Sequence, residues 1–362
     1  MIKQIPFGTT PDGLAVTIFE IACPGTTARV RLMNLGASLV GFDTPARDGS
    51  LADIVLGCDD VAGYLASGAC FGATVGPSAN RSGNAEVIVD GISYHLPKNS
   101  GPHLENNLHT DLELGLHKRV WHAEELNDQN AVRFTCKITD GEFGLPGERT
   151  FSALYTLRAV ENGNGSAAQL TLEYVCTTDA PTFVNMTNHC YFNLAGNGSG
   201  PVYDQQVQIL ADAYLPQRED NVSRGDVAAV AGTPFDFRKP KPIGRDIQAA
   251  DDQLTVANGY DHCFCVDGYT EDGAPRPALT AFDPASGREL KISLTTPAAH
   301  LYTANGLGGD KGKGGIIHQP RCAFAFEPEF YPDSSHHADW PHPVCNPDRP
   351  FESTISWRFS MR

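Results

Sequence analysis

Residues 170–176 read Leu-Thr-Leu-Glu-Tyr-Val-Cys, and this stretch shows the pattern that decides the fold. Its apolar residues recur at every second position, starting at Leu170. A period of two predicts a β-strand with one buried face and one polar or functional face. The same alternation recurs in residues 132–138, 290–294 and 355–359.

Turn signals separate the expected strands. Alternating runs lie on both sides of Asp90-Gly91 within Val87–Leu96, and an Asp-Gly pair in this setting is typical of a tight hairpin. Helical periodicity is confined to residues 59–65, with an aspartate as the N-terminal cap, and to residues 247–254. The pattern predicts a mainly β protein, a large antiparallel β-sandwich with few short helices.

Size and composition limit the fold and the partners. The chain has 362 residues, of which 41% are hydrophobic, and no segment reads as a linker, so we expect residues 1–362 to form one domain. The formal net charge of −16 repels phosphate groups, which argues against nucleic acid and anionic membranes as partners. A small neutral or cationic ligand fits better. The sequence does not separate a monomer from a homodimer.

The location of the protein is inferred from missing signals. The first residues, Met1–Pro6, contain no apolar signal segment, and no run approaches the ~18–20 apolar residues that cross a bilayer. The ten cysteines lack the close spacing of a disulfide framework. We therefore expect mostly buried thiols and a cytoplasmic location.

Residues 185–194 read Asn-Met-Thr-Asn-His-Cys-Tyr-Phe-Asn-Leu, which surrounds His189 with amides and an apolar wall. That combination suits the hydroxyls and the C–H face of a sugar. Glu327 follows an apolar run, and Glu329 would point the same way only if strand pairing continued past Pro328. A histidine and a glutamate at fixed positions can move two protons in one step, as the opening of a sugar ring requires. A buried structural histidine and an exposed strand end are the competing interpretations.

Other segments offer further polar groups to a ligand. Arg81 could donate to sugar oxygens or form a surface ion pair, and Asn80 precedes it in the same loop. His109 could bond a ligand hydroxyl or cap a loop, and Asp261 could accept from sugar hydroxyls. We take these four as candidate substrate-binding residues. His336-His337 match no metal-binding spacing, and neighbours on a strand point to opposite faces, so we predict no metal site.

Taken together, six segments resemble the aldose 1-epimerase (galactose mutarotase) family, in the order of that family. The segments are Gly76–Arg81, Asn107–His109 with Lys118–Trp121, Thr187–Leu194, Gly232–Phe237, Gly259–Phe264 and Phe326–Asp333. The resemblance implies a β-sandwich of the galactose-mutarotase type. It also implies an isomerase that interconverts the α and β anomers of a free hexose such as galactose or glucose, with neither a metal nor an organic cofactor.

The resemblance also implies roles for individual residues. Glu327 would be the base that takes the proton of the C1 hydroxyl, and His189 would be the acid that protonates the ring oxygen. The residues that would hold the sugar are Asn80, Arg81, His109 and Asp261. From ordinary pKa values we expect an ionised Glu327 at neutral pH, and we expect nearby carboxylates to raise the protonated fraction of His189.

The chain departs from the family pattern at three places. Thr110-Asp111 stand where the family has two glycines, Pro77 stands where it often has arginine, and Pro328-Glu329 replace a Thr-Gln pair. We expect these changes to affect sugar specificity, and Glu329 to raise the pKa of one carboxyl of its pair with Glu327. The alternatives are a non-catalytic carbohydrate-binding β-sandwich and a hexose-6-phosphate 1-epimerase, for which Arg81 supplies little positive charge. A structural role is a third, weaker alternative.

Overall fold

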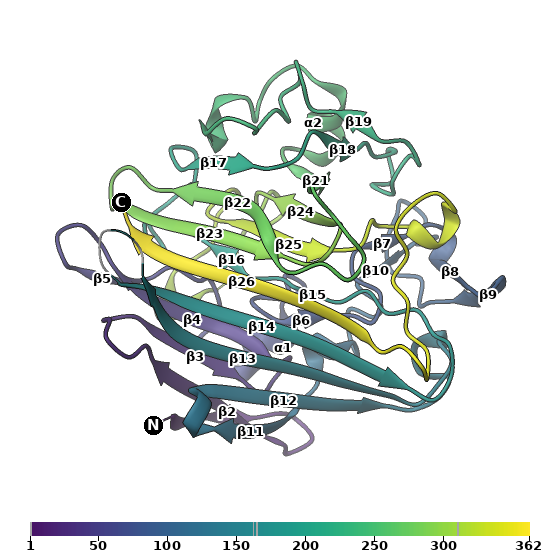
Figure 1. The fold of residues 1–362 in the computed structure, drawn as a ribbon, viewed down its shortest axis with the longest axis horizontal. Helices are drawn as coiled ribbons and strands as arrows, with labels where there is room; N and C mark the ends of the chain where they lie inside the picture. Colours follow the sequence, from purple (N-terminus) through teal and green to yellow (C-terminus); the bar gives the residue numbers. More distant parts are fainter. Residues whose placement is uncertain (1, 162, 164–165, 310) are drawn as a thin grey trace.

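Antiparallel strands form the framework of the protein (Figure 1). The computed structural model describes residues 2–161, 163, 166–309 and 311–362. Figure 1 looks onto its most extensive sheet, which we call the large sheet. In spatial order its strands are β11 (His122–Leu126), β12 (Ala131–Ile138), β13 (Arg149–Glu161), β14 (Ser166–Thr178), β26 (Phe351–Met361), β23 (Arg288–Leu294), β22 (Arg276–Phe282), β17 (Gln206–Ile209) and β20 (Lys241–Pro242).

Two smaller sheets lie behind the large sheet. The N-terminal sheet contains β1 (Lys3–Thr9), β2 (Ala15–Ala22), β3 (Arg29–Met33), β4 (Ser38–Pro45) and β5 (Leu51–Asp53). The β24–β25 sheet contains, in spatial order, β16 (Tyr191–Phe192), β25 (Phe324–Glu329), β24 (Ala298–Tyr302), β21 (Asp261–Cys265), β18 (Ala213–Leu215) and β19 (Ala228–Ala229). Short pairs join β6 (Thr74–Val75) to β15 (Thr187–Asn188), β7 (Arg81–Ser82) to β10 (Asn107–Leu108), and β8 (Glu86–Val89) to β9 (Ile92–His95).

The hydrophobic core lies between the large sheet and the two smaller sheets. Phe19 of β2 meets Phe134 of β12 edge-on, with 5.7 Å between the ring centroids. Phe192 of β16 lies 6.0 Å from Phe359 of β26, again between centroids. One continuous cluster of buried side chains includes all four residues. The architecture is therefore the expected mainly β sandwich.

The predicted strands are confirmed. Residues 170–176 lie in β14, and the three similar stretches lie in β12, β23 and β26. The hairpin is also confirmed, because Val89 pairs with Ile92 around Asp90 and Gly91. Both turn residues have positive φ, 49° and 78°, which the right-handed twist of a two-residue hairpin requires and which aspartate and glycine tolerate.

The helix predictions are correct for one helix and misplaced for the other. Helix α1 (Val61–Ala66) begins after Asp60, whose side chain accepts from the backbone N–H of Gly63. Helix α2 spans Asp252–Ala257 rather than residues 247–254. It starts later because the Asp251 carboxylate accepts from two backbone N–H groups of the first turn, which sets the helix start.

The expectation that Pro328 interrupts regular pairing is wrong. Strand β25 continues to Glu329, and Pro328 pairs with Ala299 of β24. Strand β16, on the other side of β25, pairs only with residues as far as Ala325. Proline is tolerated here because that side of the strand has no paired neighbour from the same sheet.

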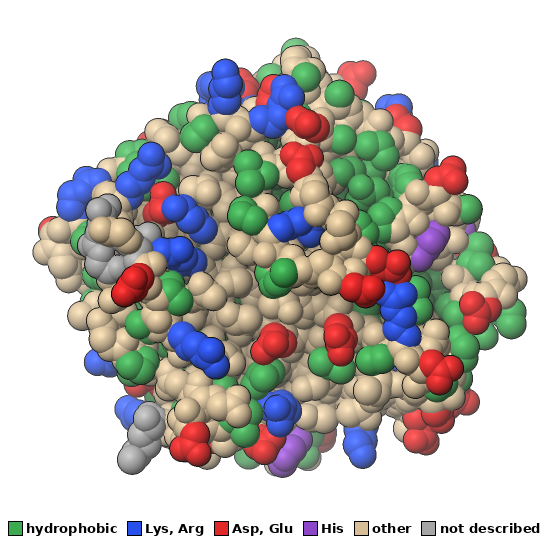
Figure 2. Space-filling model, in the orientation of Figure 1, with side chains coloured by type: hydrophobic (Ala, Val, Ile, Leu, Met, Phe, Trp, Pro, Cys, Tyr) green, Lys and Arg blue, Asp and Glu red, His purple; other side chains and the backbone are tan. Residues whose placement is uncertain are grey.

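The charge on the surface and the length of the helices bear on which partners the protein can bind. Figure 2 shows that Lys and Arg side chains are dispersed among Asp and Glu side chains over the face seen in Figure 1. This face therefore presents no broad cationic surface to a phosphate backbone. Within the described parts of the chain, no helix has the length and the apolar character needed to cross a membrane.

The alternation in β14 makes a stability prediction. Leu172 is fully buried, whereas Glu173 points to the opposite, solvent-exposed face. Leu172→Ala should lower the free energy of unfolding by about 2–5 kcal/mol, because it removes buried methyl groups and leaves a cavity. Glu173→Ala should change it by about 0.5 kcal/mol or less. Denaturant titrations of both variants measure the difference, and equal losses would contradict the assigned faces.

Candidate active site

All the residues predicted for the site line one cavity of about 320 Å³. They are Asn80, Arg81, His109, His189, Asp261 and Glu327. Short segments and loops bring them together: β7 and β10 supply one wall, and the strands of the β24–β25 sheet supply another. The other lining residues are Gly68, Ala69, Leu108, Tyr191, His300, Tyr302, Gly306 and Leu307.

His189 lies in the short connection between β15 and β16. Its backbone N–H donates to the carbonyl of Ala73, and its carbonyl accepts from the N–H of Gly72, both at 2.9 Å. Its ring faces Tyr191, with 4.8 Å between centroids. These contacts hold the imidazole on the cavity wall.

The amides near His189 do not serve a ligand as the sequence suggested. Asn188 donates to the carbonyl of Gly72 and contacts the hydroxyl of Tyr155, and Asn193 donates to two backbone carbonyls. Asn185 bonds the backbone of Phe330. These three amides satisfy buried backbone groups and thereby hold the segment that carries His189.

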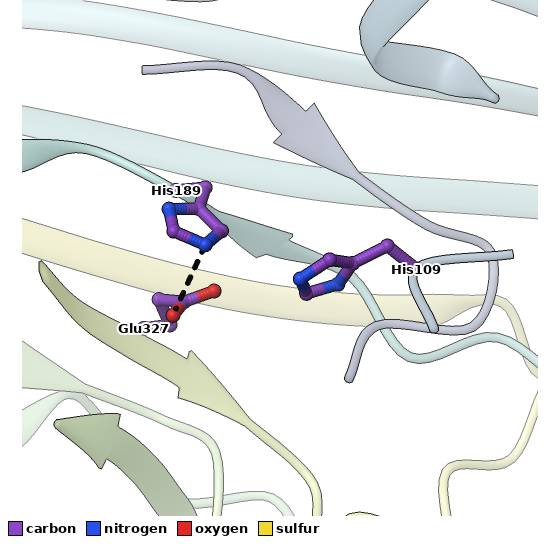
Figure 3. A group of neighbouring side chains, drawn as sticks. All are labelled: His109, His189 and Glu327. Carbon is purple, nitrogen blue, oxygen red and sulfur yellow. Dashed lines mark ion pairs between the residues drawn. The ribbon is translucent and has the colours of Figure 1, made fainter. Parts of the chain in front are cut away.

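His189 and Glu327 form an acid–base pair on the cavity wall. Figure 3 shows the His189 ring directed at the Glu327 carboxyl, with 3.5 Å between Nε2 and Oε1. Both side chains are nearly inaccessible to solvent. The second oxygen of Glu327, Oε2, has no hydrogen-bond partner among the described residues. A buried acceptor without a partner is available to a substrate hydroxyl.

The charge states expected for this pair are wrong. Burial raises the pKa of Glu327 well above its ordinary value, and the carboxylates of Glu329 and Asp261 act in the same direction. Burial lowers the pKa of His189 to about 4 despite the neighbouring carboxylates. The free-energy cost of removing the two charged groups from water outweighs their mutual attraction at 3.5 Å. Burial therefore favours a neutral histidine beside a protonated glutamate.

His109 presents a hydrogen-bond donor to the cavity. Its Nδ1 accepts from the backbone N–H of Asn80 at 3.1 Å, so a neutral ring carries its proton on Nε2. Burial lowers the pKa of His109 well below its ordinary value. Ligand-type atoms of His109, His189 and Glu327 lie within 4.8 Å of one another. Because a metal needs a nitrogen lone pair and Nε2 carries a proton, this set suits a hydroxyl better than a metal ion.

Asp261 is the second carboxylate of the cavity, and it is ionised. Its Oδ1 lies 2.7 Å from His300 Nε2, and its Oδ2 lies 3.8 Å from the guanidinium of Arg81. Burial alone would raise its pKa, but the hydrogen bond to His300 and the charge of Arg81 hold that pKa well below the ordinary value. Sequence reasoning missed His300, although a lone histidine within the apolar run Ala298–Tyr302 was a readable signal.

Comparison with known proteins places the chain in a family. The family model described as Aldose 1-epimerase matches residues 22–358. The chain belongs to the aldose 1-epimerase family. It is accordingly an isomerase that interconverts the α and β anomers of aldoses, as its resemblance to the family implied.

Similar proteins cover the chain from end to end. A galactose mutarotase of Bos taurus is 35% identical over 361 residues, which is 99% of each chain, and an aldose 1-epimerase of Escherichia coli K12 is 36% identical over the same shares. The solved GalM/aldose epimerase homologue of C. elegans superposes with a TM-score of 0.84 at 28% identity, covering 96% of this chain and 99% of that one. The galactose 1-epimerase structure from Lactobacillus acidophilus NCFM gives 0.82 at 25% identity, covering 100% and 99%.

Two of the cavity histidines, His189 and His109, make a spectroscopic prediction. His189 and His109 should both stay neutral between about pH 5.5 and 8, because burial depresses both pKa values. Ring ¹⁵N shifts measured against pH should also show His109 protonated on Nε2. His336 is the control, because its hydrogen bond to Asp333 raises its pKa and it should titrate visibly. A midpoint near the ordinary value of about 6.5 for His189 would contradict the neutral assignment.

Proposed function

We propose that the enzyme opens and recloses the ring of a free hexose, with galactose and glucose as the candidate substrates, and that Glu327 and His189 transfer the protons. The observation that carries the proposal is the distance of 3.5 Å between Glu327 Oε1 and His189 Nε2 on the wall of one cavity. Relatives named galactose mutarotase and aldose 1-epimerase support a free sugar as the substrate.

The reaction needs one proton removed and one delivered. Glu327 takes the proton of the C1 hydroxyl while protonated His189 gives its proton to the ring oxygen. The C1–O5 bond breaks, its electron pair goes to O5, and C1 becomes an aldehyde carbon. Rotation about C1–C2 and closure in the reverse sense give the other anomer. The step converts an ion pair into the neutral pair that burial favours, so the protein environment assists ring opening.

The pair holds a single mobile proton. A protonated Glu327 beside neutral His189 and an ionised Glu327 beside protonated His189 differ only by moving one proton between the two groups. Their titration therefore belongs to the pair rather than to either residue. Reclosure uses the same two groups in exchanged roles, which a mutarotation requires because it runs in both directions.

The substrate-binding roles follow from the hydrogen-bond donors and acceptors that each side chain can offer to the sugar. His109 Nε2–H donates to a hydroxyl, Arg81 donates to sugar oxygens, and the Asp261 carboxylate accepts from hydroxyls. Asn80 lines the cavity, but its amide contacts Glu329 and His300. We therefore propose that Asn80 supports the site by orienting these two side chains in addition to facing the sugar.

The competing functions need features that the site lacks. A hexose 6-phosphate would require basic side chains, and Arg81 is the only lysine or arginine among the described lining residues. A binding protein without catalysis would not require a buried carboxyl beside a buried imidazole, which burial makes costly.

We also propose that residues 1–362 act as one domain in the cytoplasm. The ten cysteines, of which nine are buried, support the cytoplasmic location.

Polarimetry tests the proposal. Freshly dissolved α-D-galactose and α-D-glucose should reach equilibrium rotation rapidly with the wild type. Glu327→Gln and His189→Asn should each lower kcat by about 10²–10⁴-fold, because each removes one proton-transfer group.

The control and the opposing outcomes are defined by the same assay. Glu173→Gln makes the same chemical change on an exposed face and should leave the rate unaltered. Near-full activity of Glu327→Gln would exclude the proposed base. Sugar binding by the wild type without any rate above solvent would favour the binding-protein alternative, and faster turnover of glucose 6-phosphate than of glucose would favour the phosphate-specific one.

A further inference from the structure

A second group of ionisable side chains lies beside the acid–base pair, and the proposed proton transfer does not use it. His300 stands between two carboxylates, with Nε2 at 2.7 Å from Asp261 Oδ1 and Nδ1 at 3.5 Å from Glu329 Oε1. The Nδ2 of Asn80 lies 2.9 Å from His300 Nδ1 and 3.0 Å from Glu329 Oε1. We call Asp261, His300 and Glu329 the charged triad.

Strand register explains how the charged triad reaches the cavity. His300 of β24 pairs directly with Glu327 of β25. Glu329 is two residues beyond Glu327 on the same strand, so both carboxyls lie on the same face. His300 therefore lies beside Glu327 in the register and contacts Glu329 as well as Asp261 of the neighbouring strand β21. The register places one histidine among three carboxyl groups.

The burial of Glu329 calls for an explanation. Its side chain is inaccessible to solvent, and its Oε2 has no hydrogen-bond partner among the described residues. A buried carboxylate costs several kcal/mol, on the order of the penalty per ion in a protein interior, unless a positive charge compensates it. His300 is its only ion-pair partner in the described part of the chain. Burial raises the pKa of Glu329, whereas its hydrogen bonds to His300 and Asn80 favour the charged form. A hydrophobic side chain at position 329 would avoid the cost of burying this carboxyl group, so we explain the group by an effect on the site.

We propose that His300 is a positioning residue: as an imidazolium between Asp261 and Glu329, it holds Asp261 ionised toward the sugar and, with Glu329, sets the protonation of Glu327. The inference rests on the acid–base role proposed for Glu327. It concerns how the pair is tuned, not which groups transfer protons.

The electrostatic balance supports this arrangement. Burial disfavours a charged ring at His300, but hydrogen bonds to Asp261 and Glu329 raise its pKa to about 10. After burial, the charge of His300 is the strongest influence on Glu327 and lowers its pKa, while Glu329 raises it. His300 and Glu329 therefore act on Glu327 with opposite signs. The titratable and charged groups around His300 are Arg81, His109, His189, Asp261, His262, Cys263, Tyr302, Glu327 and Glu329.

The charge of His300 can be read directly. Ring ¹⁵N shifts of the wild-type protein at pH 7 should show both nitrogens of His300 protonated, with Nδ1–H directed at Glu329. A neutral ring whose Nδ1 accepts from the amide of Asn80 is the opposite state, and observing it would overturn the proposal.

The pH profile of kcat/KM tests the tuning. His300→Gln removes a positive charge and should move the acid limb of the profile to higher pH by about one unit, a tenfold loss on that limb. Glu329→Gln removes a negative charge and should move the limb to lower pH by a comparable amount. The double variant loses both charges and should return the limb toward that of the wild type.

The pH profiles distinguish tuning by His300 from a purely structural role and from a failure of the proposed function. A purely structural role would lower activity at all pH values without moving the limb, and that result would overturn the proposal. Glu329→Gln keeps the test valid if His300→Gln alone folds poorly, because it removes the buried carboxylate and should still move the limb, to lower pH. If Glu327→Gln keeps full activity, the proposed function fails; if it loses activity while the three variants leave the limb unmoved, only the tuning by His300 fails.

Discussion

The antiparallel pairing of β24 with β25 is the constraint on which the site depends. It sets His300 opposite Glu327 and, through the two-residue period of a strand, places Glu329 on the same face. Strand β21 then brings Asp261 to the other nitrogen of the His300 ring. A shift of one residue in this register would turn these side chains away from the cavity and into the opposite layer. The chemistry of the cavity is therefore a consequence of strand pairing.

The loops complete what the β24–β25 sheet begins. The segment between β15 and β16 carries His189, and buried amides on either side of it bond backbone carbonyls and hold its path. The turn before β7 places the Asn80 N–H on His109 Nδ1, which decides that His109 offers a proton to the cavity. Strands thus supply the carboxyl groups and His300, and hydrogen-bonded loops supply His109 and His189.

Burial gives the site its electrostatic character. The carboxyl and imidazole groups have been removed from water, where the charged form of each would be most stable. Burial raises the pKa of Glu327 and lowers that of His189, which favours a neutral pair, whereas the pKa of Asp261 stays low because His300 and Arg81 compensate its charge. Two carboxyls in one cavity thereby acquire different roles. The net charge of −16 does not decide these states, because the local partners lie within a few ångström.

Sequence patterns were enough to predict the fold class and the residues proposed for proton transfer and sugar binding. Period-two alternation, as in residues 170–176, requires only local chain geometry and one buried face, so it was readable without the structure. The six ordered segments contained the six predicted site residues, which are Asn80, Arg81, His109, His189, Asp261 and Glu327, but not His300. Only the tertiary structure decided the partnership of His300 and Glu329, which lie 29 positions apart and meet through strand register. Only burial, which depends on all surrounding layers, decided the protonation of His189 and Glu327, because the cost of removing a charge from water cannot be read from neighbours in the chain.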